Sequence, residues 1–269
     1  MLNISPISAF SDNYIWLLYD EDSREAFVVD PGDAAPVEAA LKEMQLSLTG
    51  ILITHHHWDH TGGIDELLNA YPNIPVYGPT NEKITQINNR LVDTQTILLD
   101  MFDLTLSVMT VPGHTLDHIA YYWSNTEHAT QPSGILIAGD TIFAGGCGRM
   151  FEGTPEMFLQ SLNKITQLPD DTVLYCSHEY TLANLAFAQA VEPNNSDITQ
   201  RLIRERHKRE QQIPTLPSSI GLELATNPFV RCQQPAVINS ANSKSGQTQT
   251  TPADVFAVLR AWKNDFPVN

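Results

Sequence analysis

The chain lacks the features that mark secreted and membrane proteins. Its 269 residues include only three cysteines, which lie far apart and form no CxxC pair. Such cysteines are expected to be reduced thiols, as in a cytoplasmic protein. No stretch approaches the roughly 20 apolar residues of a membrane span, and residues 1–6 show no basic segment followed by an apolar one. We therefore expect a cytoplasmic protein with no membrane partner.

Basic residues are scarce, and the shortage is uneven. The chain has 15 Lys and Arg against 31 Asp and Glu, a net charge of −16. Residues 1–180 hold 24 acidic and 6 basic residues, whereas residues 181–269 hold 7 and 9. Because phosphate backbones need a basic surface, this balance argues against a nucleic-acid partner. The more positive second part could meet an anionic substrate, although ordinary solvated charges would give the same counts.

Histidine, in contrast, is concentrated in one place. Residues 54–60 read THHHWDH and hold four of the nine histidines, directly after the apolar run at 50–53. This spacing supplies enough ligands for two metal ions, and two adjacent metals indicate hydrolytic chemistry. A surface histidine run, such as a tag, would not be expected in mid-chain after a buried strand.

Alternation along the loop sorts these side chains. In an extended segment His55 and His57 point the same way, and His56 points elsewhere. Asp59 and His60 follow at the turn into a helix and can face a second ion. Because zinc typically takes four ligands, further ligands must come from distant segments.

Three further segments are expected to end with a residue of ligand type. The strands at 104–111, 134–138 and 172–176 lead into His114, Asp140 and His178. Functional groups of a layered α/β domain collect at strand ends, so we expect these three residues to complete the site. The ligand set of His and Asp suits zinc, iron or manganese.

Other residues of ligand type have more ordinary explanations. His118 is expected in the core or beside a ligand, and His128 and His207 in solvent. Cys176 is expected to be a packed thiol. Asp30 either accepts a hydrogen bond from a ligand imidazole or serves the Asp-Pro-Gly turn.

The order of the expected elements indicates two parts. Strands alternate with helices at 34–44 and 64–69 over residues 1–180, which predicts a layered α/β domain. The helix at 64–69 is expected to hold Asp59 and His60 in its first turn. Residues 181–269 are expected to form a small helical domain. The elements expected there are helices at 182–191 and 198–212, a mobile polar loop at 233–250, and a helix beginning after Thr251.

Several motifs together resemble a known family. THHHWDH, Gly113-His114-Thr115, Gly139-Asp140-Thr141 and His178-Glu179-Tyr180 resemble the metallo-β-lactamase fold. Residues 143–154 (FAGGCGRMFEGT), Asn227-Pro-Phe229 and Arg260-x-x-Lys263 resemble glyoxalase II, the hydroxyacylglutathione hydrolases. The resemblance covers nearly the whole chain and implies an αββα sandwich followed by a small helical domain.

The resemblance also implies how the metal ligands divide. His55, His57 and His114 would bind one ion, and Asp59, His60 and His178 the other. Asp140 would bridge the two ions, and with Asp59 it is the expected catalytic carboxylate. Zinc is the expected metal, with iron or manganese as alternatives.

The same resemblance implies a substrate site. Arg149, Phe151 and Tyr180 match positions that line the glutathione site, and Arg260 and Lys263 match the pair that holds the glycyl carboxylate. Some family members have Tyr where this chain has Phe151, so a hydroxyl contact is absent and ring contact remains.

The implied reaction is hydrolysis of S-2-hydroxyacylglutathione, with S-D-lactoylglutathione giving D-lactate, the second step of methylglyoxal detoxification. A hydroxide that bridges the metals would attack the thioester of this small-molecule partner. Alternatives are another hydrolase of the fold (lactonase, β-lactamase, nuclease or other thioesterase), a one-iron persulfide dioxygenase, or a non-catalytic metal-binding protein. A monomer is expected.

Overall fold

The computed structural model describes residues 2–125 and 132–267, so His128 lies outside the described residues. The chain divides into two compact units. Unit 1 comprises Met1–Thr110, Asp117–Ser124 and Leu136–Gly139, and unit 2 comprises Val111–Leu116, Asn125–Ile135 and Asp140–Asn269. The expected domain boundary at residue 180 stays a prediction.

The described strands form two six-stranded sheets and a hairpin. The first sheet has the order β1-β2-β3-β4-β5-β6, antiparallel from β1 to β3 and parallel from β3 to β6. Its strands are β1 (Leu2–Ala9), β2 (Asn13–Asp20), β3 (Glu25–Val29), β4 (Ser47–Leu52), β5 (Val76–Pro79) and β6 (Asn89–Leu91).

The second sheet has the order β14-β13-β10-β9-β8-β7, in which β7, β8 and β9 are antiparallel neighbours. Its strands are β7 (Thr96–Leu99), β8 (Leu104–Thr110), β9 (Ile119–Ser124), β10 (Gly134–Gly139), β13 (Val173–Cys176) and β14 (Ser218–Ser219). The hairpin pairs β11 (Ile142–Phe143) with β12 (Gly146–Cys147).

Helices follow the strands in both units. Those of unit 1 are α1 (Ala34–Met44), α2 (Trp58–Thr61), α3 (Ile64–Ala70) and the 3-10 turn η1 (Asp100–Phe102). Those of unit 2 are α4 (Pro155–Ile165), α5 (Thr181–Val191), α6 (Ser196–Glu210), α7 (Ile220–Thr226), the 3-10 turn η2 (Pro228–Val230), α8 (Pro235–Ser245) and α9 (Pro252–Asn264). Among the described residues, no helix combines the length and the apolar character needed to cross a membrane.

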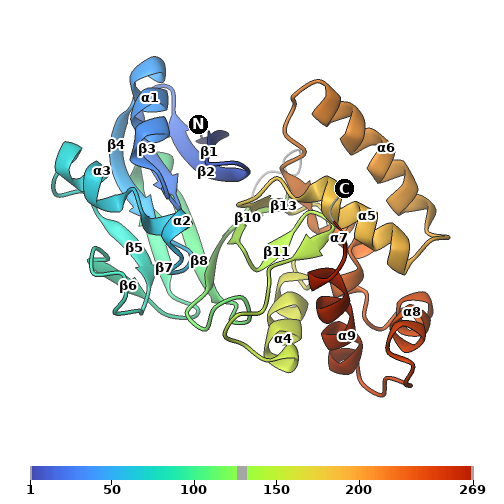
Figure 1. Cartoon of the computed structure of the whole chain (residues 1–269). Helices are drawn as coiled ribbons and strands as arrows, with labels where there is room; N and C mark the ends of the chain where they lie inside the picture. Colours follow the sequence, from blue (N-terminus) through green and yellow to red (C-terminus); the bar gives the residue numbers. More distant parts are fainter. Residues whose placement is uncertain (1, 126–131, 268–269) are drawn as a thin grey trace. The chain divides into compact units, whose positions relative to one another are not determined.

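The core of unit 1 forms where apolar helix positions meet the first sheet (Figure 1). α1 begins at Asp33, whose carboxylate accepts a hydrogen bond from Ala35 N. Val37 and Leu41, four residues apart on one face of α1, are buried in the same cluster as Ile51 of β4. This packing fixes the end of β4, from which the histidine-rich loop leaves.

The core of unit 2 is aromatic. Phe229 of η2 packs against Phe187 of α5 and Phe256 of α9, with ring centroids 5.8 and 5.7 Å apart. α9 begins with the expected cap, because Thr251 accepts from Asp254 N and the Asp254 carboxylate accepts from Thr251 N. These contacts hold the face of α9 that carries the two expected substrate-binding cations.

Two sequence-based expectations are wrong. Residues 233–250 are not a loop throughout, because α8 occupies Pro235–Ser245 and ends at Gly246 in the left-handed conformation. Asp59 and His60 lie on the one-turn helix α2 and not in the first turn of α3. The chain turns between α2 and α3 because Gly63 N donates to Pro31 O, and a Cβ at Gly63 would lie only 2.7 Å from that oxygen.

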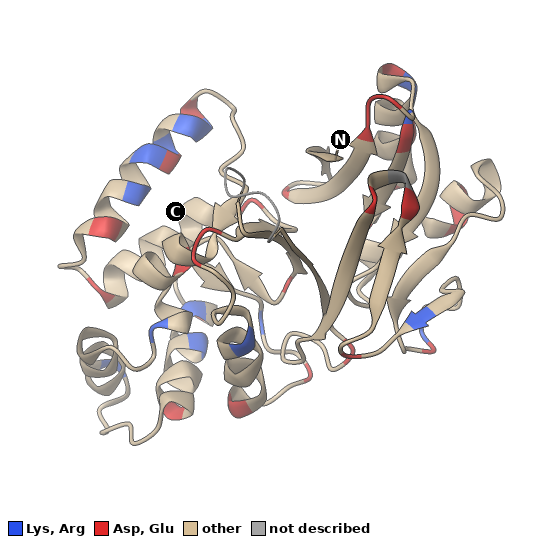
Figure 2. Ribbon diagram, turned by 180° about the vertical axis from the view of Figure 1, so that it is seen from behind, with Lys and Arg blue, Asp and Glu red and all other residues tan. Residues whose placement is uncertain are grey.

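Charge is distributed as the sequence indicates. Figure 2 shows Lys and Arg gathered mainly on helices of unit 2, above all α6, whereas Asp and Glu dominate unit 1. On α6 much of this charge is paired locally, since Glu205 lies 2.9 Å from Arg204 and 2.8 Å from Lys208.

Candidate metal centre and substrate site

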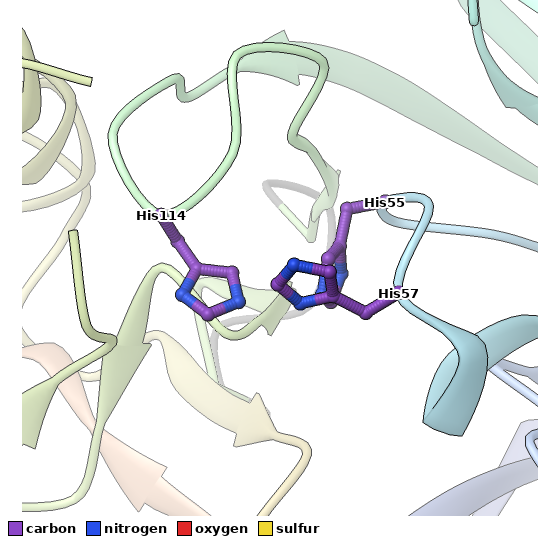
Figure 3. Close-up of side chains that lie close together, drawn as sticks. All are labelled: His55, His57 and His114. Atoms are coloured by element: carbon purple, nitrogen blue, oxygen red, sulfur yellow. The ribbon is translucent and has the colours of Figure 1, made fainter. Parts of the chain in front are cut away.

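The histidine-rich loop begins where β4 ends. His55 is fully buried, and its Nε2 lies 3.1 Å from Nδ1 of His57. Figure 3 shows both side chains leaving this loop, with His114 on its own turn after β8. His56 turns elsewhere, and its Nδ1 lies 2.8 Å from an Asp117 carboxylate oxygen. His55 and His57 therefore present their nitrogens to a common space.

Asp59 and His60 form a second pair in unit 1. Asp59 Oδ2 lies 3.4 Å from His60 Nε2, and both residues sit on α2. Asn13, at the start of β2, donates a 3.1 Å hydrogen bond from Nδ2 to the same Asp59 oxygen. This contact holds the carboxylate toward His60.

Asp30 orients the imidazoles of unit 1 from behind. Its carboxylate accepts hydrogen bonds from Thr54 N and Thr54 Oγ1, each 2.7 Å long, and lies 3.1 Å from His60 Nδ1. Thr54 Oγ1 in turn lies 3.0 Å from His55 Nδ1. Oxygen partners at Nδ1 leave Nε2 of both imidazoles to bind a metal. Of the two roles considered for Asp30, the contacts favour the ligand-orienting one.

Unit 2 gathers two imidazoles around one carboxylate. Asp140 Oδ2 lies 3.5 Å from His114 Nε2 and 3.4 Å from His178 Nε2. Asp140 follows β10, His178 follows β13, and all three side chains are buried. One carboxylate oxygen thus faces two imidazoles, as a bridging ligand must.

The separations within each unit suit metal binding. Zinc binds imidazole nitrogen and carboxylate oxygen at about 2.0–2.2 Å with tetrahedral angles, so two ligands of one ion lie roughly 3.3–3.6 Å apart. The four donor pairs are 3.1, 3.4, 3.5 and 3.4 Å apart, at or just below this range. Three imidazoles in unit 1 and two in unit 2, with Asp59 and Asp140, fit the nitrogen and oxygen chemistry of zinc, iron or manganese.

The main chain of Arg149 fixes the imidazole of His114. His114 Nδ1 lies 2.8 Å from Arg149 O, and because a carbonyl only accepts, Nδ1 must carry the proton. In the neutral imidazole, Nε2 is then the acceptor nitrogen, and it faces Asp140. The approach needs glycine at 148, because a Cβ there would lie 2.8 Å from His114 Nδ1 and 2.1 Å from Asp140 O.

Three cations expected to bind substrate lie near one another in unit 2. Arg260 is buried, and its Nη1 donates to Cys147 O at 2.9 Å and to Gly148 O at 3.3 Å, directly before Arg149. Lys263 donates to Ala183 O at 2.9 Å. Burial, followed by the positive charges of Arg260 and Arg149, lowers the pKa of Lys263 to about 8. Within residues 2–125 and 132–267, no carboxylate forms an ion pair with any of the three. The cluster is suited to an anion.

The two expected aromatic contacts flank ligands of unit 2. Tyr180 stacks on His178, with ring centroids 4.7 Å apart and planes 7° from parallel. Phe151 is 61% exposed and packs its ring edge-on against His114, 5.4 Å away. Both rings are therefore placed to contact a substrate that reaches the ligands of unit 2.

His118 and the three cysteines were not expected to be metal ligands. His118 is buried and stacks on His55, with centroids 4.6 Å apart. The thiols of Cys147, Cys176 and Cys232 are all buried, and burial raises the pKa of each. Because the thiolate is the form that binds metal, these cysteines are unsuited to ligation.

Two functional residues escaped the sequence reasoning. Asn13 lies 46 positions before Asp59, and no local pattern links them. Thr54 could have been found, because it directly precedes the first ligand and carries a hydroxyl at the end of a strand.

Comparison with known proteins covers the whole chain. Residues 10–178 match the Metallo-beta-lactamase superfamily, and residues 179–266 match the Hydroxyacylglutathione hydrolase C-terminus. The chain is 47% identical over 269 residues to a hydroxyacylglutathione hydrolase of Nitrosomonas europaea, covering 100% of this chain and 98% of that one. It is 51% identical over 264 residues to one of Alkalilimnicola ehrlichii, covering 98% and 99%.

Solved structures agree on the fold. The crystal structure of ETHE1 from Myxococcus xanthus aligns with a TM-score of 0.65 and 21% identity, covering 99% of this chain and 92% of that one. At this identity the likeness concerns the fold alone. The chain has the metallo-β-lactamase fold with a C-terminal helical region, and it belongs to the hydroxyacylglutathione hydrolase family.

Proposed function

We propose that the protein hydrolyses S-2-hydroxyacylglutathione thioesters, with S-D-lactoylglutathione as the main substrate and glutathione and D-lactate as products. Family membership over the full length supports this reaction. The structural observation that carries it is Asp140, a single carboxylate whose Oδ2 lies within 3.5 Å of both His114 and His178. Such an arrangement suits a pair of metal ions that act on one water molecule.

The seven proposed ligands would hold two metal ions. His55, His57 and His114 would hold one ion, and Asp59, His60 and His178 the other, with Asp140 between them. Zinc is the proposed metal, and iron or manganese would suit the same donors. Support comes from the donor separations within each unit, which match two ligands on a common ion.

The chain's own residues would bind and orient the reactants. Two divalent ions at these ligands would lower the pKa of a shared water toward neutrality and polarise the thioester carbonyl. Asp30, Thr54 and Arg149 O hold the protons of ligand imidazoles on Nδ1 and so keep Nε2 available. A thiolate is a good leaving group, so the reaction needs no dedicated general acid.

The cation cluster would select the thiol carrier. Arg149, Arg260 and Lys263 lie together, and no carboxylate of the described residues forms an ion pair with any of them. The glycyl carboxylate of glutathione would bind there, while Tyr180 and Phe151 contact the peptide. A monomer in the cytoplasm is the proposed state, in keeping with three buried thiols.

Release of free thiol tests the proposal. Zinc-loaded protein is given S-D-lactoylglutathione, and the glutathione produced is measured with a chromogenic thiol reagent. Release should stop after chelation and dialysis and return with zinc. A simple lactone and a β-lactam serve as competing substrates, and faster hydrolysis of either would favour another hydrolase of the fold. If protein with two bound ions releases no thiol, the proposal is wrong.

A further inference from the structure

The hairpin β11–β12 lies between two residues of the site. Asp140 precedes it and Arg149 follows it, with Gly148 N donating to Thr141 O at 3.4 Å where the chain returns. Each strand of the hairpin has only two residues, so its own ladder cannot fix its position. Contacts from elsewhere in unit 2 must hold it.

Asn227 supplies the first of these contacts. Its fully buried side-chain amide donates to Phe143 O at 3.3 Å and to Gly146 O at 2.8 Å, one carbonyl on each strand. Its Oδ1 accepts from Phe229 N and caps η2. One side chain therefore ties both strands of the hairpin to the start of η2.

Glu223 supplies the second. Its Oε2 accepts from Gly145 N at 2.7 Å, at the tip of the hairpin, and from Asn227 Nδ2 at 3.0 Å. Its Oε1 accepts from Ser218 Oγ and from Arg201 Nη2, the latter at 2.8 Å. Glu223 is fully buried and Arg201 is 2% exposed, so their ion pair is shielded from water and holds the carboxylate firmly.

The position of the hairpin affects the proposed metal ligand His114 through the two residues that follow β12, Gly148 and Arg149. Arg149 O accepts the proton of His114 Nδ1, and Gly148 lies against the same ring. A shift of the hairpin would therefore move the oxygen that orients His114, together with the Arg149 side chain.

We propose that Asn227 and Glu223 are positioning residues for the metal centre and the substrate site. They lie in the C-terminal region, residues 179–266, and neither belongs to the expected ligand or substrate-binding set. Through the hairpin they set the Arg149 carbonyl against His114 and place the Arg149 side chain. This inference rests on the proposed function, because it takes His114 to be a metal ligand and Arg149 to bind substrate.

Asn227→Ser separates this role from a simple structural one. Serine can still cap η2 but is too short to reach the two hairpin carbonyls. Zinc affinity is measured by competition with a chromophoric chelator, and KM and kcat by thiol release at saturating zinc. Because loss of a ligand's hydrogen-bond partner typically weakens metal binding 10–100-fold, we expect zinc affinity to fall about tenfold at one of two sites. KM should rise severalfold, with kcat nearly unchanged.

Asn195→Ser is the matched control. Asn195 also caps a helix, accepting from Asp197 N and Ile198 N, and its amide also donates to a carbonyl, Ala225 O. It makes no contact with the hairpin among the hydrogen bonds of the described residues. This variant should lose stability without any change in zinc affinity or KM.

The outcomes are distinct. Wild-type zinc affinity and KM in Asn227→Ser, or equal losses in both variants, would overturn the inference. Should Asn227→Ser not fold, Glu223→Gln replaces it, with Glu205→Gln as control because Glu205 is a buried carboxylate that pairs only within α6 in the described contacts. Absence of thiol release by the wild type would instead refute the proposed function.

Discussion

The Asp30 carboxylate meets the ring of His60 at 3.1 Å, and the two side chains are 2% and 1% exposed. Asp30 also accepts both hydrogen bonds that Thr54 offers, and Thr54 in turn lies against His55. One buried acid thus orients two imidazoles that we propose to bind different ions.

Asp30→Asn should therefore weaken both metal sites. An amide has one acceptor oxygen, so its NH2 group must face either Thr54 or His60 with the wrong polarity. We expect zinc affinity to fall about 10–100-fold, measured by chelator competition. Asp33→Asn is the control, because Asp33 caps α1 at the surface and Asn caps equally well. Zinc binding by Asp30→Asn that matches the wild type would contradict this role.

Asp140→Ala should abolish turnover while the chain still folds. The substitution removes the carboxylate oxygen that lies 3.5 Å from His114 Nε2 and 3.4 Å from His178 Nε2. Thiol release should fall to the rate without enzyme, and circular dichroism should show native secondary structure. Asp170→Ala, which removes an exposed carboxylate of the same unit, should retain full activity. Full turnover by purified Asp140→Ala would exclude a bridging role.

KM should depend on pH through Lys263. Burial lowers the pKa of Lys263 to about 8, so the ammonium is charged below that pH and loses its proton above it. Attraction for a substrate carboxylate is therefore lost as the pH rises, and KM should increase severalfold between about pH 7 and pH 9.5, which bracket this pKa.

Two variants check the source of that dependence. Lys263→Arg keeps its charge throughout, so its KM should stay low and flat. Lys263→Met should have a high KM that no longer changes over this range. The same rise in Lys263→Met as in the wild type would assign the dependence to another group.

Arg260→Met should destabilise the fold as well as weaken binding. Arg260 is buried, donates to Cys147 O and Gly148 O, and lies 5.0 Å above the Phe229 ring. Hydrogen bonds from charged groups contribute about 1.5–3 kcal/mol, so urea unfolding should show a loss of about that size. Lys263→Met removes one such bond at a partly exposed position, where water compensates for part of it, so its loss should be smaller than that of Arg260→Met. Equal losses in the two variants would show that Arg260 has no special structural role.

The sequence predicted those helices that carry a local signal, such as an apolar face or a capping residue. The helix at 34–44 matches α1 because its apolar residues recur on one face, and Thr251 with Asp254 marks the start of α9. α8 was missed because it buries only Val237 and Ala241 among polar neighbours. Its support is tertiary, as in the hydrogen bond from Ser240 Oγ to Val191 O.

In the candidate site, too, the residues with a local signal were predictable and the tertiary contacts were not. His55, His57 and Asp140 were predictable because each belongs to a loop that follows a strand and carries metal-binding atoms. The contacts that orient them were not, because Asn13 meets Asp59 across 46 positions and Arg149 acts on His114 through its main chain. A main-chain carbonyl acceptor cannot be recognised from the amino-acid type, because every residue has one.

The contact between Arg149 O and His114 separates the orientation of a proposed metal ligand from the choice of side chain at position 149. The oxygen that holds His114 would remain whatever side chain occupied position 149, whereas the side chain itself is exposed. Replacing Arg149 could therefore retune the protein toward thioesters of other, less acidic thiol carriers while the imidazole keeps its tautomer. Position 149 is accordingly the first place to diversify in a search for new thioesterases on this scaffold.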